Sequence, residues 1–192
     1  MNSTVTPDQS LVNERIVATA QAMRGMSTRD AETHTPALEN GNVACAYSVN
    51  KVLDAAIGRT YGANRDYVPS VVEDLKRHGE RVAADDVRPG DIAVRVAGDG
   101  ERHGHIGFVI AGGATPEILS NSSSHGSFSN VQDPTAFGKN YAGHGEDTVE
   151  FYRIDPKSVD LDWVRRAPTP DPAHALGPNA APPDPTHWTE HR

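Results

Sequence analysis

Apolar residues recur every three or four positions in the first half of the chain, which is the spacing of one side of an α-helix. The pattern predicts a helix over residues 11–25, a second helix that begins near Cys45 and ends at Gly58, and a short helix over residues 70–78. Residues 27–42, between the first two helices, are polar and include Pro and Gly, so we predict a loop there.

The second half of the chain changes to short apolar runs separated by Gly and Pro. These runs predict strands over residues 91–96, 105–111, 117–120 and 148–154. The Ser-, Gly- and Asn-rich stretch over residues 120–145 is predicted to be a long loop, and such loops are often functional. Helices first and strands afterwards predict an α+β fold, with N-terminal helices packed on a small antiparallel sheet.

The length of 192 residues suits one domain whose hydrophobic core needs no disulfide bonds. We predict a flexible N-terminus over residues 1–10, one folded domain over residues 11–166 and a Pro-rich tail over residues 167–192. That tail contains seven of the 14 prolines, a composition typical of disorder. The alternative is a segment that docks onto a partner or a secretion component, with Trp188 as its anchor.

Charge and hydropathy disfavour several classes of function. The 18 basic and 26 acidic residues give a net charge of −8, so we expect binding neither to nucleic acid nor to an anionic membrane. The longest apolar stretches, such as residues 106–111, are far shorter than a membrane span. Residues 1–8 lack the basic and apolar regions of a Sec signal, so we expect synthesis in the cytoplasm.

Cys45 is the only cysteine, which rules out an intramolecular disulfide. A free thiol has a pKa of about 8.5, and a helix N-terminus or a nearby imidazole lowers that pKa. Cys45 lies at a predicted helix start, where its own N–H has no partner within the helix and can donate to an oxyanion. Asn42, just upstream, is a second candidate oxyanion donor. The alternative role for Cys45 is that of an inert buried residue.

A histidine is available as the base that would activate this thiol. His105 opens a strand that is otherwise apolar, so the strand would hold its imidazole in place. His103, two residues earlier, is an alternative base. A third polar group should orient the imidazole and select its tautomer. Asn121, at the end of the next strand, is the best-placed candidate for that role, with Ser120 and His125 as alternatives.

Several motifs now combine: a Cys at a helix start, Pro-Gly-Asp-Ile over residues 89–92, Gly-His-Ile-Gly over residues 104–107, and a polar residue one strand further on. In this order and spacing the chain resembles the papain-like hydrolases of the NlpC/P60 and CHAP type, over roughly residues 11–155. NlpC/P60 members usually carry Asp-Cys-Ser-Gly, whereas residues 44–47 are Ala-Cys-Ala-Tyr, which is closer to the CHAP type.

The resemblance implies a papain-like fold and a cysteine peptidase or amidase that cuts amide bonds in peptidoglycan peptides, without a cofactor or metal. Cys45 falls at the nucleophile position, His105 at the base position, and Asn121 or Ser120 at the third position. In the expected mechanism His105 holds the proton of Cys45 as an ion pair, and the thiolate attacks the amide carbonyl. The N–H of Cys45 and the side chain of Asn42 would stabilise the oxyanion.

Two other classes of function compete with this hypothesis. His103, His105, His125 and His144 lie within about forty residues and suggest a zinc-dependent hydrolase. The second alternative is a degenerate papain-like module that binds without catalysis. A serine hydrolase is disfavoured because no Gly-x-Ser-x-Gly motif is present.

A wall-cutting enzyme without a Sec signal fits two biological settings. One is an antibacterial effector, delivered as a toxin by a secretion component and held in check by an immunity protein. The other is a phage-type lysin. In both settings the enzyme would act in the periplasm or cell wall after delivery by a non-classical route.

Overall fold

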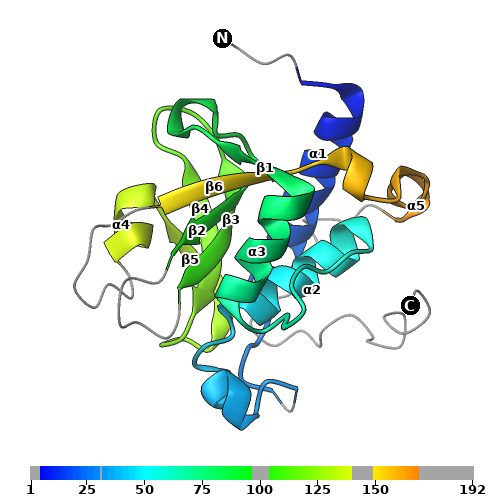
Figure 1. The fold of residues 1–192 in the computed structure, drawn as a ribbon. Helices are drawn as coiled ribbons and strands as arrows, with labels where there is room; N and C mark the ends of the chain where they lie inside the picture. Colours follow the sequence, from blue (N-terminus) through cyan, green and yellow to red (C-terminus); the bar gives the residue numbers. More distant parts are fainter. Residues whose placement is uncertain (1–4, 31, 97–103, 140–148, 169–192) are drawn as a thin grey trace.

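The structure is a computed structural model that describes residues 5–30, 32–96, 104–139 and 149–168. In it, helices combine with an antiparallel sheet (Figure 1), which confirms the predicted α+β class. The α-helices are α1 (Pro7–Ala22), α2 (Cys45–Ile57), α3 (Val68–His78), α4 (Pro134–Lys139) and α5 (Leu161–Arg166). Short 3₁₀ helices are η1 (Pro36–Gly41), η2 (Ala84–Asp86) and η3 (Pro156–Ser158).

One antiparallel sheet joins strands from both halves of the chain. Its strands are β1 (Gly79–Val82), β2 (Ile92–Arg95), β3 (His105–Ala111), β4 (Glu117–Ser122), β5 (Ser127–Gln132) and β6 (Val149–Ile154). They lie in the order β1-β6-β2-β3-β4-β5. On β3, His105 pairs with Arg95 of β2, and Gly107 pairs with Ser120 of β4. The sheet therefore brings β2 and β4 to either side of the strand that carries the candidate base.

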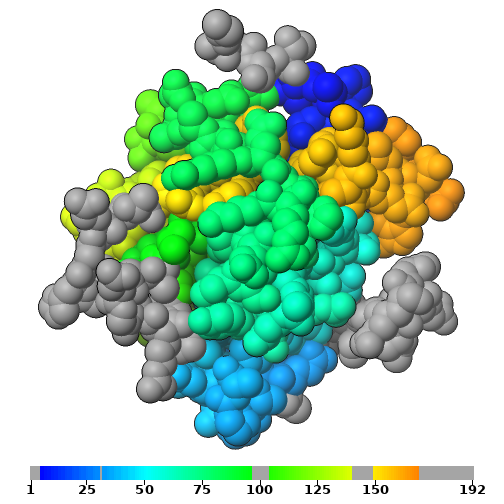
Figure 2. Space-filling model, viewed as in Figure 1, coloured from blue at the N-terminus to red at the C-terminus, as the bar shows by residue number. Residues whose placement is uncertain are grey.

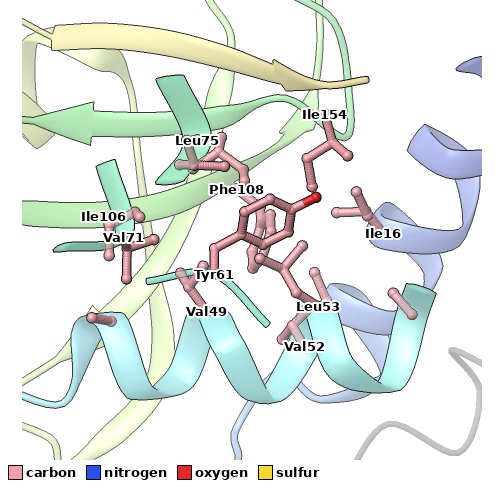
Figure 3. Packing of buried hydrophobic residues seen from close by; sticks show 14 of the residues in the cluster. Ile16, Val49, Val52, Leu53, Tyr61, Val71, Leu75, Ile106, Phe108 and Ile154 are labelled. Carbon is pink, nitrogen blue, oxygen red and sulfur yellow. The ribbon is translucent and has the colours of Figure 1, made fainter. Parts of the chain in front are cut away.

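Helices α1, α2 and α3 gather along one side of the sheet, whereas α4 lies at its other side (Figure 1). The main core fills the helix side, where the fully buried ring of Tyr61 lies among aliphatic side chains of α1, α2, α3 and the sheet (Figure 3). A smaller cluster on the other side contains Phe137 of α4 with Ala93, Val109, Ile118 and Phe151. The segment that contains the 3₁₀ helix η1, coloured light blue, lies at the lower end of the molecule (Figure 2).

The helices follow the predicted apolar stripes, but two of them begin earlier than predicted. The side chain of Thr6 accepts the N–H of Gln9, and Pro7 suits the first turn, so α1 includes residues 7–10. Those residues are therefore not part of the predicted flexible N-terminus. Helix α3 begins at Val68, and the Ser70 hydroxyl accepts the N–H of Asn64. Helix α2 ends as predicted, because Gly58 adopts a left-handed φ of 65°.

Four strands were predicted, and β3 has the predicted bounds. The prediction of one long loop over residues 120–145 is wrong for residues 120–122, which end β4, and for residues 127–132 and 134–139, which form β5 and α4. β5 is an edge strand with a single buried side chain, that of Phe128, so it lacks the apolar run that identifies a central strand. Residues 140–145 lie outside the described residues.

Candidate active site

Cys45 is the first residue of α2, and only 7% of its surface is exposed. Burial raises the pKa of its thiol to about 11, although hydrogen bonds from the backbone N–H groups of Ala46, Cys45 and Ile106 act in the opposite direction. Two of these donors come from the first turn of α2, where helix N–H groups have no partner within the helix. The thiol is therefore protonated at neutral pH in this closed site.

The third donor comes from the strand that carries the candidate base. Ile106 follows His105 directly in β3, so the bond between its N–H and the sulfur brings the thiol to the start of that strand. The structure thus brings together Cys45 and the beginning of β3, which the chain separates by sixty residues. The roles of Cys45 as nucleophile and of His105 as base stay predictions.

The imidazole of His105 is held on two sides and is 2% exposed. Its Nε2 lies 3.0 Å from the hydroxyl oxygen of Ser120, and its ring centroid lies 4.9 Å from that of Phe137. Gly107 allows β3 and β4 to approach closely at this point. A Cβ at Gly107 would lie 2.6 Å from the carbonyl oxygen of Leu119 and 2.9 Å from the Cβ of Ser120. The second glycine of the Gly-His-Ile-Gly motif is therefore needed for the His105–Ser120 contact.

Burial and, to a smaller extent, the positive charge of Arg95 together lower the pKa of His105 to about 3. Arg95 is 3% exposed and is the direct cross-strand partner of His105. The imidazole is consequently neutral at pH 7. A neutral thiol and a neutral imidazole differ from the ion pair expected from the sequence, because burial disfavours the charged form of each group.

Ser120, rather than Asn121, makes the contact with the imidazole. The side-chain oxygen of Asn121 accepts a hydrogen bond from the Thr28 hydroxyl at 2.7 Å. Ser120 pairs with Gly107, which lies two residues from His105 on the same face of β3, and successive residues of a strand point to opposite faces, so Asn121 points away from the imidazole. His125, the other alternative, is exposed in the turn after β4, where its Nδ1 lies 3.0 Å from the Ser122 hydroxyl.

Asn42 lies three residues before Cys45 and is exposed. Its side-chain oxygen lies 3.4 Å from Nη2 of Arg29, and its backbone oxygen accepts a hydrogen bond from the Ser123 hydroxyl. Its role as an oxyanion donor stays a prediction. Arg29 was not identified in the sequence, because its contacts join segments that are distant along the chain.

The Asp of the Pro-Gly-Asp-Ile motif has a structural role in this fold. The fully buried carboxylate of Asp91 accepts two hydrogen bonds of 2.8 Å from the Arg153 guanidinium. It also accepts the backbone N–H of Arg88 at 2.8 Å. The motif therefore ties the turn before β2 to β6, and so supports the strand next to β3.

The competing histidines fall partly outside the described residues, since His103 and His144 belong to the ranges that the structure leaves out. Among the residues that it does describe, no three His, Cys, Asp or Glu side chains gather closely enough to hold a metal ion. Within the same part of the chain, no helix has the length and apolar character to cross a membrane.

Comparison with known proteins finds no protein-family model and no curated protein that matches the chain. Three groups of this chain remain as indications of its function: the thiol at the start of α2, the imidazole at the start of β3, and the hydroxyl on β4.

Proposed function

We propose that this chain is a papain-like cysteine amidase or endopeptidase that cleaves amide bonds of peptidoglycan peptides. One observation carries the proposal. The Cys45 sulfur accepts the N–H of Ile106, and the adjacent His105 places Nε2 3.0 Å from the Ser120 hydroxyl. Nucleophile, base and orienting group thus follow one another from α2 through β3 to β4, in the order that the sequence motifs predict.

Ser120 would select the tautomer of the base. When its hydroxyl oxygen accepts the proton of Nε2, the unprotonated nitrogen of the His105 ring is Nδ1. The base is then ready to remove a proton from the thiol. Phe137, packed on the ring, limits its rotation and keeps Nδ1 in one direction.

Proton transfer and attack would be coupled, because burial keeps both groups neutral beforehand. Nδ1 of His105 takes the thiol proton as the Cys45 sulfur forms a bond to the substrate carbonyl carbon. The backbone N–H groups of Cys45 and Ala46, with Asn42 as the predicted additional donor, receive the oxyanion. The imidazolium gives its proton to the leaving amine as the C–N bond breaks. Water then hydrolyses the thioester, with His105 again acting as base.

The substrate class and the biological setting come from the resemblance to NlpC/P60 and CHAP hydrolases. We propose that the enzyme acts on cell-wall peptides after delivery as an antibacterial effector, which an immunity protein would neutralise, or after release as a phage-type lysin. Transfer of the acyl group to an acceptor other than water would use the same thioester.

The test is mass spectrometry of purified peptidoglycan, incubated with the wild type, Cys45→Ala or Ser120→Ala. We expect new muropeptide fragments with the wild type, none with Cys45→Ala, and a reduced yield with Ser120→Ala. Matched melting temperatures would show that Cys45→Ala is folded. Fragments produced equally by Cys45→Ala would overturn the proposal.

A non-catalytic binding module is the second candidate, and the 7% exposure of Cys45 favours it. This candidate predicts that folded wild-type protein releases no fragments from any wall type, yet co-sediments with intact peptidoglycan. Fragment release that depends on Cys45 excludes it.

A further inference from the structure

Arg29 extends from one edge of the sheet towards the loop that precedes Cys45. The segment before it pairs with β5: Gly25 N–H donates to the Phe128 carbonyl at 2.8 Å, and Thr28 N–H donates to the Gly126 carbonyl at 2.9 Å. This pairing fixes the backbone from which the Arg29 side chain begins. The starting point of the side chain is therefore set by the sheet rather than by a free loop.

Two glycines leave room for the aliphatic part of this side chain. A Cβ at Gly126 would lie 2.5 Å from Cδ of Arg29, and a Cβ at Gly41 would lie 3.1 Å from its Cγ. Both glycines have positive φ angles, 61° and 90°. Arg29 therefore packs between the turn that follows β4 and the loop that precedes α2.

The guanidinium then links these two segments. Nη2 of Arg29 donates to the backbone oxygen of Ser123 and lies 3.4 Å from the side-chain oxygen of Asn42. The Ser123 hydroxyl donates to the backbone oxygen of Asn42. Asn42 is thus held to the turn through its side chain and through its backbone.

The loop that these contacts hold is strained. Glu39 and Asn40 adopt left-handed φ angles of 49° and 57°, which are uncommon for residues other than glycine. Such conformations persist only where the surrounding contacts stabilise them, and they are frequent at functional sites. Only two residues separate Asn42 from the first residue of α2. A displacement of Asn42 would therefore move the nucleophile and its helix N–H groups.

We propose that Arg29 is a positioning residue for the proposed hydrolysis: it holds Asn42 against the turn after β4 and so fixes both the start of α2 and the direction of the Asn42 amide. Because a guanidinium can only donate, it binds the amide oxygen and directs the amide nitrogen away from itself, as an oxyanion donor requires. This inference rests on the proposed function for its catalytic part, but the positioning of Cys45 can be tested without any substrate.

The kinetic test compares Arg29→Ala and Arg29→Lys with Arg24→Ala, which removes the same charge from another exposed arginine. We expect Arg29→Ala to lower kcat at least tenfold and leave KM within about twofold, because oxyanion contacts form only in the transition state. Arg29→Lys should recover part of the activity, and Arg24→Ala should match the wild type. Equal kcat values for Arg29→Ala and the wild type would overturn the inference.

A double-mutant cycle tests whether Arg29 acts through Asn42. If it does, Arg29→Ala combined with Asn42→Ala should lose no more activity than Asn42→Ala alone. Losses that multiply would mean that Arg29 acts by another route, and the inference would be wrong on that point.

The substrate-free test is the rate at which iodoacetamide alkylates Cys45, followed by intact-mass spectrometry at pH 8.5. Without the Arg29 contacts to Asn42 and Ser123, the Cys45 thiol, which is 7% exposed, should become more accessible to solvent. We therefore expect at least fivefold faster alkylation in Arg29→Ala and no change in Arg24→Ala. Faster alkylation with no hydrolysis by the wild type would support the positioning and reject the enzyme. Hydrolysis by the wild type with unchanged alkylation and kcat in Arg29→Ala would reject the positioning alone.

Discussion

Burial sets the charge of the two candidate catalytic side chains, because moving an ion out of water is unfavourable. The pKa of the Cys45 thiol rises to about 11 and that of the His105 imidazole falls to about 3, so both groups are neutral near pH 7. The Ser120 hydroxyl is a suitable partner for a neutral imidazole, because it can fix the tautomer of His105. A carboxylate in its place would also stabilise the charged imidazolium, which an uncharged hydroxyl does not. Charge would then appear only as the substrate reacts.

The buried imidazole should make the stability of the fold depend on pH. In the unfolded chain His105 binds a proton near pH 6.5, whereas in the folded chain it does so only near pH 3. Proton binding to His105 therefore favours unfolding. The fold has its full stability with respect to this group above about pH 6.5, and it loses stability as the pH falls towards 3. Between pH 7 and pH 5 we expect a loss of about 2 kcal/mol in the free energy of unfolding. Urea denaturation of the wild type and His105→Gln at both pH values measures it, and equal pH dependence in the two proteins would contradict it.

The buried thiol should react with alkylating agents only as the pH rises. Because the pKa of Cys45 is about 11, the thiolate fraction grows about tenfold per pH unit between pH 7 and pH 10. We expect the alkylation rate with iodoacetamide to follow that increase, without a plateau at acidic pH. A rate that is already constant between pH 5 and pH 8 would instead indicate a thiolate–imidazolium pair.

The sequence identified the elements that carry the site but not all of its contacts. Helix α2 and strand β3 were predicted because a long apolar stripe and a continuous apolar run are strong local signals. The sequence favours Asn121 over Ser120, because the register of β4 against β3, which decides which of the two faces His105, leaves no mark in the sequence. Arg29 was missed because its role exists only once residues 42 and 123 have come together in the fold.

The link between β2 and β6 offers a test of the fold around the site. Asp91→Asn removes the negative charge from a fully buried ion pair and leaves the Arg153 guanidinium with only its 3.4 Å pair to Asp86, so we expect a loss of about 3 kcal/mol in the free energy of unfolding. Asp8→Asn is the matched control, because its 2.8 Å pair with Arg165 is about half exposed and should contribute at most about 1 kcal/mol. Urea denaturation measures both, and similar small losses would show that Asp91 is not structurally important.

The described core extends from α1 to α5, whose contacts lie close to the predicted domain boundary. Val164 of α5 is 1% exposed in the helix-side core, and Arg15 of α1 donates to the backbone oxygens of Ala167 and Pro168 at 2.9 Å. These contacts join the two ends of the described chain. The contacts of the described chain thus reach residue 168, and the predicted domain boundary at residue 166 stays a prediction.

Two truncations test this boundary. A chain that ends at Pro168 retains α5 and its contacts with Arg15, so we expect its Tm to stay within about 2 °C of that of the full chain, with unchanged muropeptide release. A chain that ends at Asp160 loses the buried Val164 and the Trp163 ring that packs on Gly58. Losing these side chains removes roughly 3 kcal/mol of apolar burial, which corresponds to a fall in Tm of about 6–12 °C for a domain of this size. Differential scanning calorimetry distinguishes the outcomes, because an equal fall in both truncations would place part of the folded core beyond residue 168.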